Sequence, residues 1–152
     1  MTTVNQCMTG HVVTVDASAS CHDAVTLMVR NRIRHLPVVN DTGALCGIVT
    51  DRDVRHRLFA PDVFPSIGSV RVEELLSTVR VRDVMAAPVT SVDSGAELRE
   101  AARVMAEKKV GSLPVVERDR VVGIVTETDV LRHIVGADAC CADVEAIVVS
   151  YP

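Results

Sequence analysis

Apolar and polar positions follow the same order twice along the chain. Residues 12–15 form a short run typical of a strand, and residues 21–28 carry apolar side chains at the spacing of one helix face. Two further apolar runs, 36–39 and 45–49, are separated by the polar turn 40–43, which predicts a β-hairpin. The pattern therefore predicts a strand, a helix, two strands and a second helix.

The second half of the chain repeats the first. Shifted by 77 positions, residues 4–39 fall on 81–116 with 12 of 36 identical. Shifted by 76, residues 47–54 fall on 123–130 with 6 of 8 identical. Two copies are too few for a solenoid, so we expect the halves to pack on each other.

In the second copy the helix pattern is clearer. Leu98, Ala101, Ala102 and Met105 recur at helical spacing. The second hairpin is expected from strands 113–116 and 121–125 around a turn at 117–120. Met28 and Met105 are expected in the core.

The repeat divides the chain into four parts. Copy one spans residues 1–59, a linker 60–80, copy two 81–136 and a tail 137–152. The linker begins as a loop because of Pro61 and Pro65, and residues 73–76 are expected to form a short helix. In the tail, residues 144–149 predict a strand that copy one lacks.

Polar residues mark the beginning of each helix. Ser20 is a predicted N-cap, with Asp23 three residues later. The strongest motif is Gly-apolar-apolar-Thr-x-x-Asp, which places Thr50 before Asp53 and Thr126 before Asp129. Gly47 and Gly123 begin this motif and permit close approach of another backbone.

Two interpretations of Thr-x-x-Asp stand side by side. In a capping box, the Thr hydroxyl accepts from the N3 amide and the Asp carboxylate accepts from the Thr amide. In a ligand site, the helix N-terminus attracts an anion and the Asp side chain accepts hydrogen bonds from a pair of ribose hydroxyls. The occurrence of the motif twice, after the same glycine-containing strand, favours ligand binding without excluding capping.

The two copies differ just before the Leu-Pro step. Copy one has Arg34 and His35 where copy two has Gly111 and Ser112, and Arg52 where copy two has Thr128. Arginine suits bidentate contact with phosphate, so Arg34, His35 and Arg52 are candidate phosphate ligands, whereas Gly111 and Ser112 leave room for a base. The alternative is a solvated helix face, which we favour for Arg30 and Arg32.

Composition excludes several classes of function. The formal net charge is −4 and aromatic residues make up 2% of the chain, which disfavours nucleic-acid binding. The start of the chain does not resemble a signal peptide, and no stretch approaches the roughly 20 apolar residues of a membrane span, so we expect a cytoplasmic protein.

No residues suggest catalysis or metal binding. The histidines lack metal-ligand spacing with cysteine or carboxylate residues, and no nucleophile–base arrangement is evident. The five cysteines have no disulfide-framework spacing, and the adjacent Cys140 and Cys141 are expected to be incidental thiols. We therefore expect neither an enzyme nor a metal site.

Together these motifs resemble a known family, the CBS domain pair or Bateman module. The matching residues are Val-x-x-x-Met (Val4 with Met8, Val81 with Met85), the Ala-to-Met helix, Leu-Pro-Val-Val and Gly-Ile-Val-Thr-x-x-Asp-Val. The resemblance covers about residues 4–59 and 81–135. More closely, Ile-Arg-His-Leu-Pro at 33–37 and Thr-Asp-Arg-Asp at 50–53 are similar to acetoin-utilisation (AcuB-type) proteins, in which an ACT domain follows the pair; here a complete ACT domain is not expected.

The resemblance implies an α/β fold of two βαββα-type units packed about a pseudo-two-fold axis with two clefts. In many members these clefts bind AMP, ADP or ATP, and in some S-adenosylmethionine. The ligand-binding residues then expected here are Val12, Val13, Arg34, His35, Leu36, Pro37, Thr50, Arg52, Asp53, Val89, Thr90, Gly111, Ser112, Leu113, Pro114, Thr126 and Asp129.

The expected function is that of a regulatory module that binds adenosine-containing ligands. The alternative is a ligand-free scaffold that acts by oligomerisation, because such pairs commonly form homodimers. The sequence leaves open which ligand binds, whether both clefts are occupied and which protein is regulated.

Overall fold

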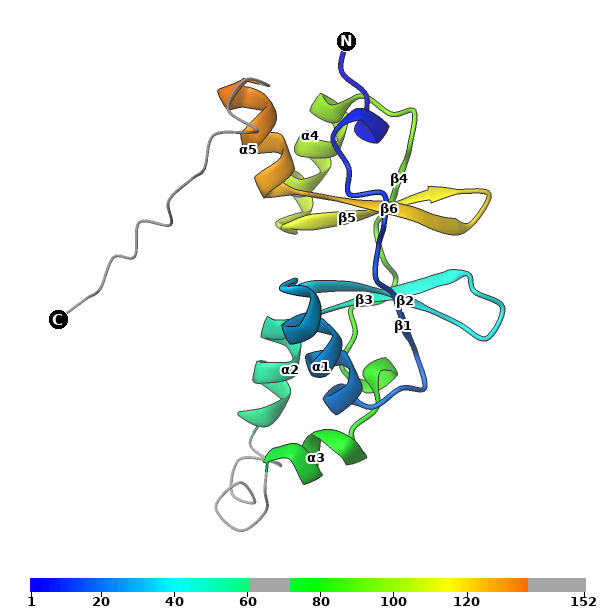
Figure 1. Cartoon of the computed structure of the whole chain (residues 1–152), viewed down its shortest axis with the longest axis vertical. Coiled ribbons are helices and arrows are strands. Elements are labelled where there is room, and N and C mark those ends of the chain that lie inside the picture. Colours follow the sequence, from blue (N-terminus) through cyan, green and yellow to red (C-terminus); the bar gives the residue numbers. More distant parts are fainter. Residues whose placement is uncertain (61–71, 137–152) are drawn as a thin grey trace, which may run out of the picture.

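Each copy of the repeat folds into a three-stranded sheet with helices on one side, and the two hairpins face each other (Figure 1). The computed structural model describes residues 1–60 and 72–136. Copy one contains β1 (Val15–Asp16), α1 (Cys21–Asn31), β2 (His35–Val39), β3 (Leu45–Thr50) and α2 (Asp51–Leu58). Copy two contains β4 (Val92–Asp93), α4 (Leu98–Lys108), β5 (Ser112–Glu117), β6 (Arg120–Thr126) and α5 (Glu127–Val135). The predicted βαββα order is confirmed.

Both sheets have the same topology. The first strand runs parallel to the second, and the second pairs antiparallel with the third, in β1-β2-β3 and again in β4-β5-β6. The prediction of a strand at 12–15 was wrong in extent, because only Val15 of that run pairs in the sheet. The rest of the run belongs to the segment that connects the two copies.

The second hairpin is tighter than its sequence suggests. Arg118 and Asp119 form a two-residue turn, with φ angles of 48° and 67°, so the strands extend to Glu117 and from Arg120. Copy one uses a longer turn, in which Gly43 has a φ of 78° and the Asn40 side chain accepts hydrogen bonds from the amides of Thr42 and Ala44.

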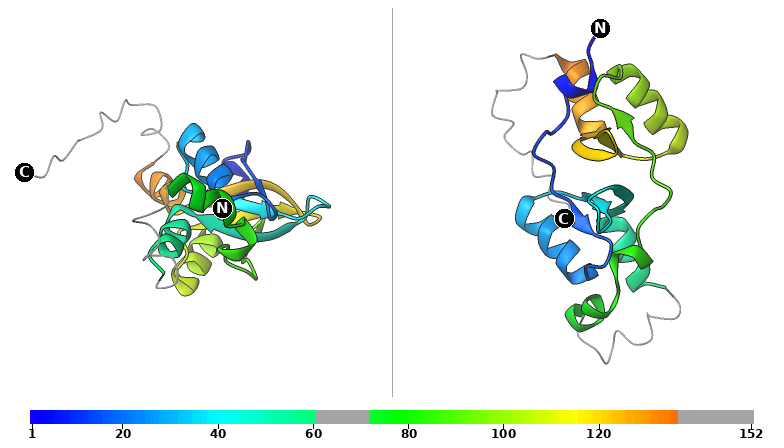
Figure 2. Two further views of the ribbon diagram at one scale, coloured as in Figure 1. Left: turned by 90° about the horizontal axis from the view of Figure 1, so that it is seen from below. Right: turned by 90° about the vertical axis from the view of Figure 1, so that its right-hand side faces the viewer.

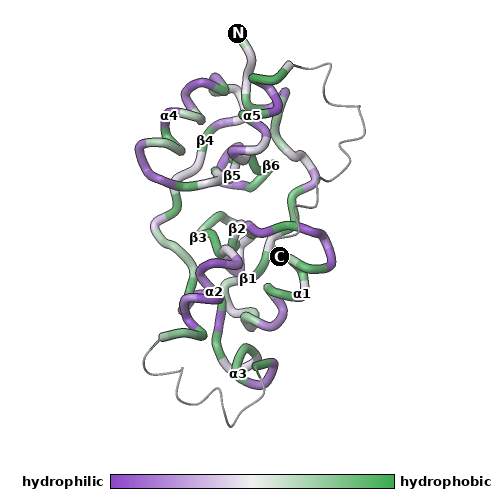
Figure 3. Tube along the Cα trace, turned by 90° about the vertical axis from the view of Figure 1, so that its left-hand side faces the viewer, coloured by the Kyte–Doolittle hydropathy of each residue, from purple (hydrophilic) through white to green (hydrophobic). Residues whose placement is uncertain are grey.

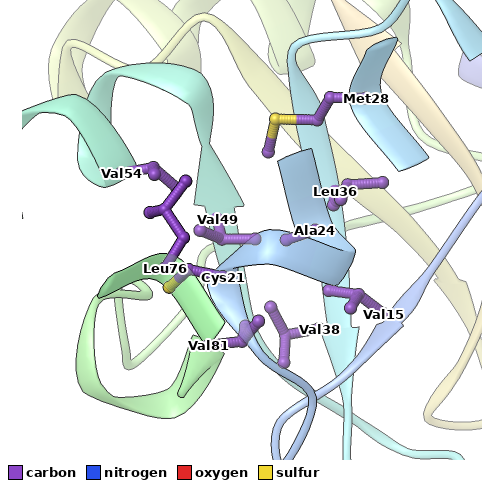
Figure 4. Close-up of a cluster of buried hydrophobic side chains, with 10 residues drawn as sticks. All are labelled: Val15, Cys21, Ala24, Met28, Leu36, Val38, Val49, Val54, Leu76 and Val81. Atoms are coloured by element: carbon purple, nitrogen blue, oxygen red, sulfur yellow. The ribbon is translucent and has the colours of Figure 1, made fainter. Parts of the chain in front are cut away.

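The linker contributes a helix to copy one. This helix, α3 (Val72–Thr78), matches the short helix expected in the linker and packs against α1. Its Leu76 joins a core of ten buried side chains, which also contains Cys21 and Met28 (Figure 4). The expected tail strand at 144–149 lies outside the described residues.

The first segment of each copy packs into the core of the other copy. Val4 is 0% exposed in the copy-two core, and its amide donates to the Ala96 carbonyl at 2.9 Å. Val81 is likewise fully buried in the copy-one core, where its amide donates to the Ala19 carbonyl at 2.9 Å. Figure 2 shows the two connecting segments that result, on opposite sides of the molecule in its right-hand view. Neither core is therefore complete within its own repeat.

This exchange explains the glycine that begins each Gly-apolar-apolar-Thr motif. A Cβ on Gly123 would lie 2.5 Å from Met8 Sδ and 3.0 Å from the Thr9 carbonyl oxygen. A Cβ on Gly47 would overlap Met85 Sδ and lie 3.2 Å from the Ala86 carbonyl oxygen. Each glycine thus leaves room for a methionine side chain from the other copy, and the expected close approach of another segment is confirmed.

Candidate functional site

A cavity lies between the two copies, where α2 and α5 begin. It encloses about 570 Å³, and its walls come from both repeats. Copy one contributes Arg34, His35, Ile48, Thr50, Asp51, Arg52, Asp53 and Arg55. Copy two contributes Ala86, Pro88, Val89, Thr90, Lys109, Val110, Gly111, Ser112, Thr126, Glu127 and Thr128.

Thr50 and Asp53 form a complete capping box at the start of α2. The Asp53 amide donates to Thr50 Oγ1 at 3.2 Å, and the Thr50 amide donates to Asp53 Oδ2 at 2.8 Å. The Thr50 hydroxyl also donates to Oδ2 at 2.8 Å. The capping interpretation is therefore confirmed. The cap uses one carboxylate oxygen of a half-buried Asp53 that lines the cavity, so capping and ligand contact are compatible at this residue.

Thr126 and Asp129 repeat this capping box at the start of α5. The Thr126 amide donates to Asp129 Oδ2 at 2.8 Å and the hydroxyl donates at 2.7 Å. The second carboxylate oxygen of Asp129 lies 4.0 Å from Arg132 Nη1, and its side chain is 12% exposed. Thr126 lines the cavity whereas Asp129 does not. The two motifs are alike in capping and differ in their access to this cavity.

The segment that leads into β4 forms the wall beside the start of α2. Ala86 pairs with Ile48 of β3 through hydrogen bonds of 2.8 and 3.1 Å. This pairing places Val89 and Thr90 of copy two in the same cavity as Thr50 and Asp53 of copy one. In the other half of the molecule Thr9 pairs with Ile124 through hydrogen bonds of 2.9 and 3.1 Å. Each helix start is therefore matched with the leading segment of the opposite copy.

His35 of copy one lies beside Gly111 of copy two. A Cβ on Gly111 would lie 3.6 Å from His35 Nε2 and 3.6 Å from Glu127 Oε2. Burial lowers the pKa of the half-buried His35 below its ordinary value, and neighbouring Arg34 lowers it further. The carboxylates of Asp51, Glu127 and Asp53 act in the opposite direction. The lowered pKa favours the neutral form of an imidazole that lies in the cavity wall close to both copies.

The cavity carries charges of both signs. Four cationic side chains line it, those of Arg34, Arg52, Arg55 and Lys109. Arg55 pairs with Asp51 at 2.9 Å, an exposed pair within α2. Much of α2 is hydrophilic, in contrast to the central strands (Figure 3).

The cavity brings together ten of the predicted ligand-binding residues. These are Arg34, His35, Thr50, Arg52, Asp53, Val89, Thr90, Gly111, Ser112 and Thr126. Of the others, Leu36, Pro37, Leu113 and Pro114 are fully buried in the sheets, and Val12, Val13 and Asp129 do not line this cavity.

Four charged residues of the cavity were missed by the sequence reasoning: Asp51, Arg55, Lys109 and Glu127. The signal for Asp51 and Glu127 was their position directly after the N-cap Thr. Lys109 lies at the end of α4, far along the chain from the motif, and only the packing of the two copies brings it to the cavity.

Other chemistry is not evident in the part of the chain that the structure describes. Burial raises the pKa of the Cys21 thiol to about 11 and also raises the pKa values of Cys7 and Cys46, so these thiols favour the protonated form. Cys140 and Cys141 lie outside the described residues. Over residues 1–60 and 72–136, no cluster of metal-binding side chains occurs, and no helix has the length and apolar character of a membrane span.

Comparison with known proteins identifies the fold and its family. The CBS domain model matches residues 4–60 and 81–136. The chain belongs to the CBS domain family and contains the paired form of the domain. It is similar to a putative acetoin utilization protein (AcuB) from Vibrio cholerae, with 34% identity, a TM-score of 0.68 and coverage of 89% of this chain and 91% of that one. The predicted CBS pair of AcuB type is confirmed.

Two further relatives show how much of each protein the similarity covers. CBSX2, solved in complex with AMP, is 29% identical, with a TM-score of 0.68 and coverage of 89% of this chain and 97% of that chain. Uncharacterized protein MJ1404 of Methanocaldococcus jannaschii is 35% identical over 88% of this chain, but the chain spans only 32% of that protein's length. The similarity therefore concerns the CBS pair and not the whole of the longer relative.

Proposed function

We propose that this chain is a regulatory module that binds an adenosine-containing ligand in the cavity between its two copies, with AMP, ADP and ATP as the first candidates and S-adenosylmethionine as a further one. One observation carries the proposal. A single cavity contains a helix start with an accessible carboxylate, Asp53, the backbone wall at Val89 and Thr90, and the cationic side chains of Arg34 and Arg52.

Each of these groups suits one part of a nucleotide. The free oxygen of Asp53 accepts hydrogen bonds from ribose hydroxyls. The segment at Val89 and Thr90 offers backbone groups and an apolar surface to the base. Arg34 and Arg52 suit phosphate oxygens. The related CBSX2, crystallised with AMP, supports an adenine nucleotide as the ligand class. The proposal is one of binding, because the groups that line the cavity each suit contact with a part of a nucleotide.

The matched variants Asp53→Ala and Asp129→Ala test the proposal. Each removes the N3 carboxylate of one capping box, and the loss of such a hydrogen bond costs about 1 kcal/mol of stability, but only Asp53 lines the cavity. A ligand that binds the native state alone raises stability by about 2.7 kcal/mol at one hundred times its Kd. We expect a thermal-shift titration with ATP, ADP and AMP to stabilise the wild type and the Asp129→Ala variant, and to lose its effect in Asp53→Ala.

Two results would contradict this proposal. The first is a wild type whose melting temperature does not respond to any of these compounds at millimolar concentration. The second is a response that survives in Asp53→Ala and disappears in Asp129→Ala, which would place the ligand in the opposite cleft.

A second candidate function, oligomerisation through α5, is supported by exposed apolar side chains. Leu131, Ile134 and Val135 are 60%, 72% and 72% exposed, and their spacing places them on one helix face. We propose a second molecule of this protein as the partner, since a homodimer covers this face of α5 in both subunits at once.

Native mass spectrometry separates the two functions. We expect a dimer for the wild type and a monomer for Leu131→Glu. The control is Ala106→Glu, at an exposed position of α4, which should leave the dimer intact. A ligand-free dimer without any response to nucleotides would favour the scaffold over the sensor, and a monomeric wild type would exclude the scaffold.

A further inference from the structure

The unpaired cations of the cavity come from both copies. Arg55 is paired with Asp51, but among the described residues Arg34, Arg52 and Lys109 form no ion pair. Arg34 and Arg52 lie on the copy-one side, beside β2 and at the start of α2. Lys109 comes from the copy-two side. A ligand anion is therefore offered positive charge at two separate places along the cavity.

The backbone at the end of α4 holds the position of Lys109. Lys109 is the C-cap residue, with φ 55° and ψ 44°, and its amide donates to the Met105 carbonyl. The next residue, Val110, donates to the same carbonyl at 3.0 Å. Met105 is buried in the copy-two core, so the backbone of the lysine is held at a fixed point, and its flexible cationic side chain begins at the cavity wall.

Gly111 lies on the copy-two side of the cavity, beside a histidine and a carboxylate. Gly111 has no side chain where copy one has Arg34, and its nearest cavity neighbours are His35 Nε2 and Glu127 Oε2. The Asp51 and Glu127 amides are already engaged by the Arg34 and Gly111 carbonyls, at 3.2 and 3.0 Å. These two helix amides are therefore not free to bind a phosphate. Contacts to the outer phosphates of a ligand must come from cationic side chains instead.

We propose that the cavity selects nucleoside di- and triphosphates over monophosphates, and that Lys109 determines this selection by binding a terminal phosphate from the opposite copy. The inference rests on the proposed nucleotide site. With the ribose at Asp53, the first phosphate lies beside Arg52 and Arg34, and a longer phosphate chain extends across Gly111 to Lys109. A bound nucleotide of this class joins the two copies through its phosphates.

Isothermal titration calorimetry with adenosine, AMP, ADP and ATP, in the absence of divalent cations, tests the proposal. We expect affinity to rise along that series. Lys109→Asn should weaken ATP binding about tenfold, the effect of losing one charge-assisted contact, and change AMP binding less than about twofold. Asparagine is chosen because it tolerates the left-handed backbone conformation of this position.

Two control variants separate a specific contact from general charge. Lys108→Gln removes the same charge from an exposed neighbour that does not line the cavity, and it should leave ATP affinity unchanged. Lys109→Arg keeps the charge and should retain the preference for ATP. Equal affinity for AMP and ATP in the wild type, equal weakening of both by Lys109→Asn, or an equal effect of Lys108→Gln would overturn the role of Lys109. A wild type that binds none of the four compounds would refute the nucleotide site itself.

Discussion

The glycine at the start of the second Gly-apolar-apolar-Thr motif gives a sharp test of the exchanged segments. In Gly123→Ala the new methyl group would lie 2.5 Å from Met8 Sδ, 3.1 Å from Met8 Cγ and 3.0 Å from the Thr9 carbonyl oxygen. The methionine can rotate away, but the carbonyl cannot move freely, because Thr9 and Ile124 exchange two hydrogen bonds of 2.9 and 3.1 Å. The substitution therefore forces the first segment away from β6.

The cost follows from these contacts. Overpacking a tight site costs about 1–3 kcal/mol, and weakening the two hydrogen bonds adds about 1 kcal/mol. We expect Gly123→Ala to lower the free energy of unfolding by about 3 kcal/mol, or the melting temperature by roughly 6–12 °C for a chain of this size. Urea denaturation followed by circular dichroism is the suitable measurement, because the chain contains no Trp and one Tyr.

Gly10→Ala is the matched control. A Cβ at Gly10 meets no atom within 4 Å, so this variant should stay within about 0.5 kcal/mol of the wild type. Adding Met8→Ala to Gly123→Ala should recover about 1 kcal/mol relative to the sum of the single effects, because the sulfur overlap is then removed. Equal stability of Gly123→Ala and Gly10→Ala would refute the claim that Met8 and Thr9 pack too closely against Gly123 to admit a side chain there.

Three further predictions concern the cores and the cavity. Val4→Ala should destabilise the protein by about 2 kcal/mol. Although Val4 belongs to the first repeat, amide hydrogen exchange should become faster first in β5 and β6. Faster hydrogen exchange confined to copy one would contradict the packing of Val4 in the copy-two core. His35 has a lowered pKa, so the unfolded chain binds its proton more readily than the native state. The resulting stability is complete above the ordinary His pKa of 6.5 and is lost as the pH falls below it. His35→Gln should flatten this part of the pH–stability curve measured by urea denaturation, and an unchanged curve would contradict the lowered pKa of His35. Cys21, with a pKa of about 11 and no exposed surface, should react with a thiol reagent at pH 8 only on unfolding, and rapid labelling in the native state would show that this part of the core opens.

The sequence predicted helix starts and turns correctly where hydrogen bonds between residues close in the chain determine them. Ser20, Thr50 and Thr126 begin helices because their side chains accept from the amide three residues later, and that bond needs no distant partner. The Asn40 turn is local in the same way. The repeat itself follows from the sequence alone, since identical spacing predicts identical units.

Local pattern failed where a strand needs a partner at long range. Residues 12–14 have strand propensity but lie outside β1, because that part of the chain crosses between the two copies. The linker helix was predicted, but its contribution of Leu76 to the copy-one core was not, since a short apolar pair does not indicate what it packs against.

For the candidate site, the sequence by itself determined which residue types are available: the paired Thr-x-x-Asp motifs, the arginines of copy one and the small residues Gly111 and Ser112. Only the tertiary structure decided how they are combined. It matched Thr50 and Asp53 with Val89 and Thr90, left Asp129 outside the cavity and brought in Lys109. The physical reason is that each core is completed by a segment from the opposite copy, and such long-range contacts are fixed by packing rather than by local propensity.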